Sequence, residues 1–251
     1  MVYKWDLHIP KLSPELSRRA NLYLPAGYDE QPDRRFPVMY MFDGHNVFFD
    51  EDATYGKSWG MARYLDETQT PLIVAAVECN SIGNNRLEEY CHFTCEDPKL
   101  GVIRGRGRAT MNWFVHEFKP MIDANIRTLS DRSNTFICGS SMGGLMSLYA
   151  ATAFNATFGK AACLSPSLWL GAGKMRRIIN QADIAPDTLI YMDYGGEEMA
   201  NHTANLSALT SCSTALLKKG VDLTFRIAPG GTHCEASWER QIPVFMKCLG
   251  F

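Results

Sequence analysis

Seven short apolar segments, each four to six residues long, recur along the 251-residue chain and alternate with helical stretches. From Val38 onward several of them are almost continuously apolar, which is typical of strands covered on both faces in a parallel sheet. This alternation predicts an open, mostly parallel α/β sheet with helices on both faces. The expected strands are 21–24, 38–42, 72–77, 135–138, 160–164, 189–192 and 223–227, and the expected helices are 113–126, 145–153, 199–217 and 235–249.

We expect the chain to form one domain over residues 1–251. It is 46% hydrophobic and 21% charged, enough for one sizeable core, and shows no internal repeat or linker. Residues 78–110 are polar and turn-rich, and the run 101–108 carries three glycines and three arginines. So long a stretch without periodicity indicates either a functional loop near an active site or a solvated surface loop.

Charge and cysteine usage narrow the possible functions and locations. Lys plus Arg is 25 and Asp plus Glu is 27, a net charge of −2, which favours neither a nucleic acid nor a membrane partner. We find no signal peptide and no apolar run long enough to span a bilayer, and we expect a cytoplasmic protein whose eight cysteines are reduced. Cys91-His92-x-x-Cys95 lacks a second ligand pair, so no metal is predicted. The oligomeric state stays open.

The strongest chemical signal is the pattern Gly-x-Ser-x-Gly centred on Ser141, directly after an expected strand and before an expected helix. In that context a nucleophilic serine is presented on a sharp turn above the end of the sheet. The turn leaves almost no room for side chains two positions before and after the serine, hence Gly139 and Gly143. A glycine-rich turn with an incidental serine is the alternative, which the strand–turn–helix setting disfavours.

A serine hydroxyl needs a base to remove its proton, and in this type of sheet the chain order is serine, acid, histidine. Of six histidines only His202 and His233 follow Ser141. His202 falls in an expected helix, whereas His233 lies in a glycine-rich loop just after the last expected strand. His233 is therefore the predicted base.

The acid is expected just after the strand 189–192, where three carboxylates follow one another. Asp193 still falls within the strand, whereas Glu198 lies past a Gly-Gly turn and could reach the far nitrogen of the histidine. We favour Glu198, with Asp193 and then Glu197 as alternatives.

Two backbone N–H groups are predicted to hold the oxyanion. One is that of Met142, at the N-terminus of the helix after the serine. The other belongs to His45 or Asn46, after the strand 38–42, with His45 preferred. Residues predicted to contact substrate are Asn46, Phe48, Trp169, Arg86 and Tyr90. Trp169 and Phe48 would equally suit the core, and Arg86 and Tyr90, with Glu89, could instead hold the long loop.

Several stretches resemble the putative esterase family of α/β-hydrolases, from roughly residue 22 onward. They are FICGSSMGGLMSLYA around Ser141, GGTHCEASW around His233, FGKAACLSPSLW, PVMYMFDGHNVF and RLEEY. The family includes S-formylglutathione hydrolases, feruloyl and acetyl-xylan esterases, siderophore esterases and mycolyltransferases. The resemblance implies an α/β-hydrolase fold, a Ser–acid–His triad, an acyl-serine intermediate and no cofactor. The family's acid falls on Glu198, where many members have Asp, and His45 stands where many have Gln.

The sequence thus predicts a serine esterase acting on a small-molecule or sugar-linked ester of the acetyl or feruloyl type. An acyltransferase with the same acyl-serine and a catalytically silent binding module are the alternatives. Arg104, Arg106 and Arg108 could in addition select acidic esters.

Overall fold

A computed structural model describes residues 1–198 and 202–251 and contains an eight-stranded sheet. The strand order is β1-β2-β4-β3-β7-β8-β9-β10, in which β2 alone runs in the direction opposite to the other seven strands. The predicted mostly parallel α/β sheet is therefore confirmed. The strands are β1 (Val2–Ile9), β2 (Ser13–Tyr23), β3 (Val38–Met41), β4 (Ile73–Val77), β7 (Thr135–Ser140), β8 (Lys160–Leu164), β9 (Leu189–Gly195) and β10 (Asp222–Ala228).

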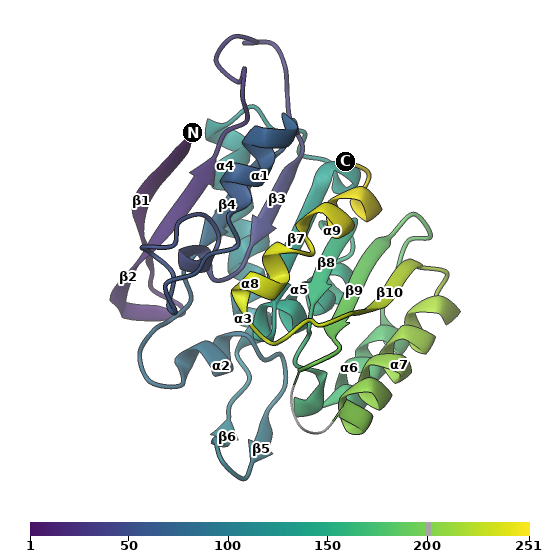
Figure 1. Cartoon of the computed structure of the whole chain (residues 1–251). Coiled ribbons are helices and arrows are strands. Elements are labelled where there is room, and N and C mark those ends of the chain that lie inside the picture. Colours follow the sequence, from purple (N-terminus) through teal and green to yellow (C-terminus); the bar gives the residue numbers. More distant parts are fainter. Residues whose placement is uncertain (199–201) are drawn as a thin grey trace.

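Helices cover both faces of this sheet (Figure 1), and the central strands are therefore buried on both sides. One apolar cluster joins the sheet to α1 (Met61–Thr68), α8 (Glu235–Glu239) and α9 (Ile242–Leu249). A second joins the other face to α3 (Gly107–Trp113), α4 (Lys119–Asn125), α5 (Met142–Ala153), α6 (Ala172–Gln181) and α7 (His202–Lys218). None of the described helices is long and apolar enough to cross a membrane.

Several elements differ from their expected ranges. The N-terminal hairpin of β1 and β2 was predicted only as 21–24, because its outer strand has an irregular burial pattern at the sheet edge. The helices α1 and α6 were not predicted from the sequence. The range 113–126 is divided by a π-helical turn at Phe114–Phe118, and 235–249 forms two helices. The expected helix 199–217 is found from His202, its first three residues lying outside the described part of the chain.

Residues 78–110 are not a structureless loop. They form α2 (Asn85–Glu89) and an antiparallel hairpin of β5 (Cys95–Asp97) and β6 (Gly101–Ile103), and then enter α3. The hairpin projects away from the sheet at the lower edge of Figure 1. The elements α2, β5 and β6 have only three to five residues each, too few for a periodic pattern to repeat, which is why the sequence showed no periodicity.

A buried ion pair joins α2 to the sheet. Arg18 on β2 donates to both carboxylate oxygens of Glu89, at 2.8 Å between Nη1 and Oε2, and both side chains are almost fully buried. Glu89→Gln should lower the free energy of unfolding by about 3 kcal/mol, because a buried guanidinium loses its counter-charge. Urea denaturation measures the change.

The control for this prediction is the exposed pair of Lys11 and Glu117. Glu117→Gln should cost less than about 1 kcal/mol, since water screens that pair. Equal losses for the two variants would contradict the role given to burial.

Candidate active site

The sheet reverses its winding direction between β3 and β7, and a cavity of about 660 Å³ opens beside the carboxyl ends of these strands. Such a point is where ligands bind in open α/β sheets. Loops that follow four strands build its wall, together with α2 and α8. The lining residues are Asp43, His45, Asn46, Thr54, Tyr55, Glu78, Cys79, Asn80, Ser81, Gly83, Arg86, Ser140, Ser141, His233, Glu235 and Trp238.

Ser141 lies in a strained turn between β7 and α5. Its φ of 57° and ψ of −118° are rare for a residue with a side chain. A Cβ on Gly139 would come within 2.7 Å of the backbone of Gly143, and one on Gly144 within 2.6 Å of the Leu164 carbonyl oxygen. The predicted need for glycine at position 139 thus has a direct steric cause, and Gly144 adds a second close approach that the motif did not reveal.

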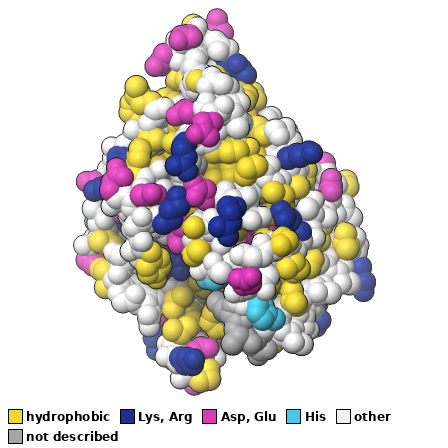
Figure 2. Space-filling model, in the orientation of Figure 1, with side chains coloured by type: hydrophobic (Ala, Val, Ile, Leu, Met, Phe, Trp, Pro, Cys, Tyr) yellow, Lys and Arg dark blue, Asp and Glu magenta, His cyan; other side chains and the backbone are white. Residues whose placement is uncertain are grey.

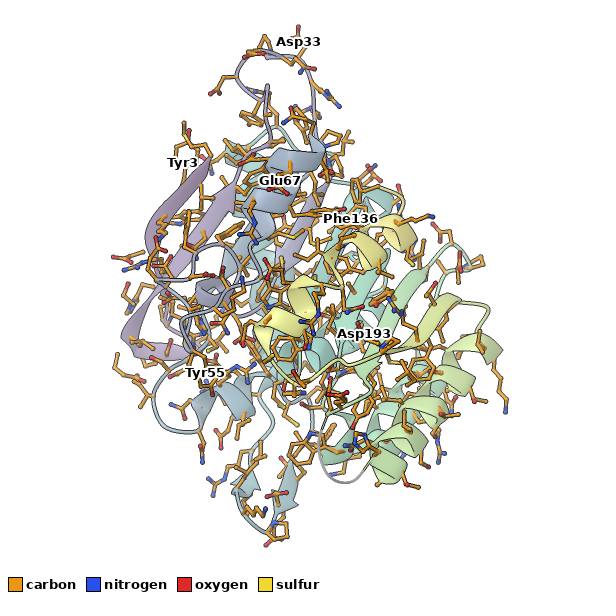
Figure 3. All side chains as sticks on the ribbon, viewed as in Figure 1. Tyr3, Asp33, Tyr55, Glu67, Phe136 and Asp193 are labelled. Carbon is orange, nitrogen blue, oxygen red and sulfur yellow. The ribbon has the colours of Figure 1, made fainter. Side chains whose placement is uncertain are left out.

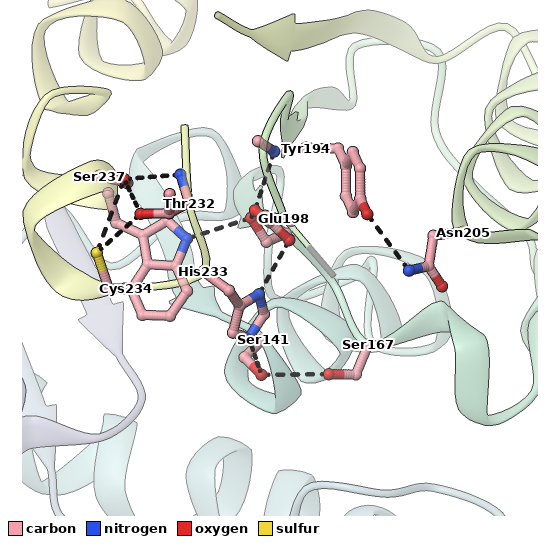
Figure 4. A network of polar contacts seen from close by, with 12 residues as sticks. Ser141, Ser167, Tyr194, Glu198, Asn205, Thr232, His233, Cys234 and Ser237 are labelled. Carbon is pink, nitrogen blue, oxygen red and sulfur yellow. Dashed lines mark hydrogen bonds and ion pairs between the residues drawn. The ribbon is translucent and has the colours of Figure 1, made fainter. Parts of the chain in front are cut away.

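Three predicted residues form one hydrogen-bonded chain (Figure 4). His233, in the loop after β10, lies with Nε2 2.9 Å from Ser141 Oγ. Its Nδ1 lies 2.9 Å from Oε2 of Glu198, in the turn after β9. The arrangement suits an imidazole that takes the serine proton while the carboxylate fixes its orientation.

The Glu198 carboxylate is itself held in place. Its Oε1 accepts the Gly195 N–H at 2.9 Å and the hydroxyl of Ser165, which in turn accepts a hydrogen bond from Nε1 of Trp238 at 3.2 Å. Sequence reasoning missed Ser165 and this role of Trp238. A serine just after β8, at the same sheet edge, was the available signal.

Asp193, the alternative acid, lies within β9 and faces other groups. Its carboxylate accepts the Ser165 N–H at 3.1 Å and the Tyr191 hydroxyl at 2.9 Å. Burial raises the pKa of Asp193 to about 6. The third alternative, Glu197, is exposed.

The raised pKa of Asp193 gives a pH-dependent stability. The folded chain holds this proton more tightly than the unfolded chain, so stability is lost as pH rises from 3.8 through about 6. Asp193→Asn removes that titration. The free energy of unfolding of the wild type, relative to Asp193→Asn, should therefore fall by about 2 kcal/mol between about pH 4.5 and about pH 7. Denaturant titrations of both proteins across that range measure the difference, and parallel pH profiles would contradict it.

Of the two predicted oxyanion donors, Met142 directly follows Ser141 in the chain, and His45 lines the same cavity as Ser141. Met142 is the first residue of α5, where N–H groups have no acceptor within the helix. On the other side, the Asn46 N–H donates to the Asp43 carbonyl at 2.8 Å. That bond leaves the N–H of His45 as the better candidate in this loop, as the sequence had suggested.

The predicted substrate contacts divide into two groups. Asn46 and Arg86 line the cavity. Phe48 is buried in the apolar cluster under α1, and Trp169 lies against a much smaller hollow beside Tyr194. Tyr90 is buried and its hydroxyl accepts the Asp43 N–H at 3.2 Å, so it supports the cavity wall from behind.

Arg86 forms a two-pronged ion pair with Asp43, with both Nε–Oδ1 and Nη2–Oδ2 at 2.7 Å. Burial alone would raise the pKa of Asp43, but the guanidinium outweighs it and holds that pKa below its usual value. Asp43, His45 and Cys79 each offer a ligand atom within 4.8 Å of the others. A cation fits poorly there, because Arg86 already occupies both carboxylate oxygens.

The arginines of the run 101–108 do not line the cavity, as far as the described residues extend. Arg106 donates to the carbonyl oxygens of Lys11 and Leu12 and so fastens the turn between β1 and β2. The Arg104 N–H bonds to Glu88. These contacts do not support the suggestion that the run selects acidic esters.

Comparison with known proteins shows which family the chain matches and which solved structures share its fold. The family model described as putative esterase matches residues 13–247. The uncharacterized protein YbbA of Bacillus subtilis (strain 168) is 25% identical over 185 residues, or 72% of this chain and 69% of that protein. An IroE-like serine hydrolase from Shewanella oneidensis superposes with a TM-score of 0.77 at 18% identity, over 99% of this chain and 79% of that one. A ferulic acid esterase gives 0.70 at 16%, over 100% and 98%. The predicted α/β-hydrolase fold is confirmed.

Proposed function

Because this chain belongs to the putative esterase family, we propose that it hydrolyses carboxylic esters through an acyl-enzyme formed on Ser141. The observation that carries the proposal is the unbroken hydrogen-bonded chain from Ser141 through His233 to Glu198, which opens on the large cavity. A nucleophile, a base and a buried acid in that order are what acyl transfer requires.

In the first half of the reaction Ser141 Oγ attacks the ester carbonyl carbon while His233 Nε2 takes its proton. Glu198 accepts a hydrogen bond from Nδ1 and stabilises the imidazolium that results. The N–H groups of Met142 and His45 donate to the oxyanion of the tetrahedral intermediate. His233 then protonates the leaving alcohol, and the acyl group remains on Ser141.

In the second half a water molecule enters the place that the alcohol has left. His233 removes a proton from that water, and the hydroxide attacks the acyl carbonyl. Collapse of the second tetrahedral intermediate returns the proton to Ser141 and releases the carboxylic acid. These reaction steps require no cofactor. An alcohol in place of water would give acyl transfer by the same steps.

The wall of the cavity is mixed in polarity and suits a small-molecule ester better than a long fatty acyl chain. Asn80 and Ser81 are polar groups of this wall, and Tyr55 and Trp238 add aromatic surface. A long alkyl chain would have to cover the carboxylates of Glu78 and Glu235. That one structural neighbour is named a ferulic acid esterase is compatible with an aromatic acyl group.

A panel of chromogenic acetyl, butyryl, octanoyl and feruloyl esters tests the proposal. We expect hydrolysis of the acetyl, butyryl and feruloyl esters, with the octanoyl ester the poorest. Acceptor alcohols added to the same assay separate a hydrolase from a transferase by their ester products. A folded protein with no turnover of any ester, and no transfer, would contradict the proposal and favour a silent binding module.

A further inference from the structure

The cavity beside Ser141 carries more negative than positive charge. Its wall holds three carboxylates, Asp43, Glu78 and Glu235, and one guanidinium, that of Arg86. Arg86 is committed to Asp43 through two hydrogen bonds, so these two charges cancel. Glu78 and Glu235 take part in no ion pair with any of the described residues. Two carboxylates without counter-charges therefore face the space that a substrate must enter.

Glu235 is the more informative of the two. It is 6% exposed, lies two residues after His233, and belongs to the cavity wall. The one side chain bonded to it among the described residues is Asn46, whose Nδ2 lies 3.1 Å from Oε1. A carboxylate this buried normally has a basic partner. Burial raises the pKa of Glu235, and the nearby Asp43 also raises it, while a hydrogen bond from the backbone N–H of Glu235, together with His233 and His45, acts in the opposite direction.

Glu78 belongs to the same cavity wall and lies in the loop after β4. Its Oε2 accepts the backbone N–H of Arg19 at 3.3 Å, a neutral donor that leaves its charge uncompensated. The face of the molecule seen in Figure 2 carries acidic and basic side chains side by side. The imbalance is thus a local property of the cavity in a chain whose net charge is only −2.

We infer that the cavity selects esters that carry a cationic ammonium group, which Glu235, with Glu78, neutralises. The inference rests on the proposed esterase function and names its substrate class. An ammonium ion supplies the counter-charge that Glu235 lacks, and one that carries N–H groups can also donate to the carboxylate. Trp238 in the same wall offers an aromatic surface to an alkylated ammonium. An anionic ester meets repulsion in the same place.

Acetylthiocholine and 3,3-dimethylbutyl thioacetate form a matched pair, because they share a shape and differ by one positive charge. The thiol released from each is followed with a disulfide reagent. We expect kcat/KM to be about tenfold higher for the cation, the size of one partly buried charge pair. The anionic 3-sulfopropyl thioacetate should be slower than the neutral ester. Raising the ionic strength should reduce the preference.

Glu235→Gln keeps the shape and the amide partner and removes the charge, so the ratio between cation and neutral ester should fall at least about threefold. Glu67→Gln is the control, because it removes the same charge on α1, well away from Tyr55 of the cavity wall and from Asp193 (Figure 3). Its ratio should equal that of the wild type. The ionic-strength series needs no variant and tests the inference even if Glu235→Gln does not fold.

The outcomes separate the inference from the function beneath it. If the neutral thioester is hydrolysed by the wild type, lost with Ser141→Ala, and preferred to or equal to the cation, the charge inference is wrong and the esterase stands. If neither thioester nor any ester of the panel is hydrolysed, the function itself fails. A preference for the cation that Glu235→Gln leaves unchanged would also overturn the role given to Glu235.

Discussion

Ser141→Ala is expected to lower kcat/KM for a chromogenic acetyl ester by at least about 10⁴-fold, since the oxyanion donors alone cannot form the acyl-enzyme. The fold should be unaffected, because the hydrogen bonds of the hydroxyl are to two side chains of the site, those of His233 at 2.9 Å and Ser167 at 3.3 Å, rather than to the backbone of a neighbouring element. A loss of this size is resolved by initial rates measured at enzyme concentrations high enough for the catalysed rate to exceed the background rate of hydrolysis.

Ser167→Ala is the matched control for that prediction. Its hydroxyl lies beside the nucleophile, at 3.3 Å, yet it is not the atom that contacts His233 Nε2. We expect a loss of less than about tenfold, the cost of one neutral hydrogen bond. If Ser167→Ala were the more damaging of the two, the nucleophile would have been assigned to the wrong serine.

Glu198→Gln is expected to lower kcat by about 10³-fold to 10⁴-fold with little change in KM. The amide oxygen keeps the hydrogen bonds from the Gly195 N–H and the Ser165 hydroxyl, so the NH2 group faces His233 Nδ1. A donor there fixes the tautomer whose Nε2 carries a proton, and that nitrogen then cannot accept the proton of Ser141. The buried carboxylate also stabilises the imidazolium in the transition state, and an uncharged amide does not. Steady-state kinetics on the best ester of the panel measures both constants.

Asp193→Asn gives the comparison that identifies the acid. Asp193 bonds to Ser165 and Tyr191 rather than to His233, so its loss should reduce kcat by less than about tenfold. Circular dichroism establishes that both variants are folded. A larger catalytic loss for Asp193→Asn than for Glu198→Gln would assign the triad acid to the strand.

The fold could be predicted from the sequence most accurately where the strands are buried on both faces. Strands such as β3 and β4 are continuously apolar, and their ranges were predicted to within one residue. The edge hairpin of β1 and β2 was mostly missed, because the prediction rested on continuously apolar segments, whereas β1 and β2 mix apolar with polar residues, as strands with one solvated face do. The helices α1 and α6 are short, and tertiary packing stabilises them: α1 packs into the apolar cluster of the sheet, and α6 packs against α5 and α7.

The residues of the candidate site likewise fall into those that the sequence predicts and those that it does not. The positions of Ser141 and His233 follow from local turn chemistry and chain order, both of which a sequence displays. The support of Glu198 by Ser165 and Trp238 joins segments far apart in the chain, and no local pattern marks it. The core position of Phe48 and the unpaired charge of Glu235 likewise depend on which loops meet above the sheet.

The most direct test of the whole account is covalent labelling with a serine-reactive p-nitrophenyl phosphonate, followed by intact-protein and peptide mass spectrometry. The account predicts one adduct per chain, on Ser141, formed with release of one equivalent of p-nitrophenol and absent from both Ser141→Ala and His233→Ala. An adduct on another residue, or a folded chain that takes up none, would contradict a nucleophile at Ser141 activated by His233.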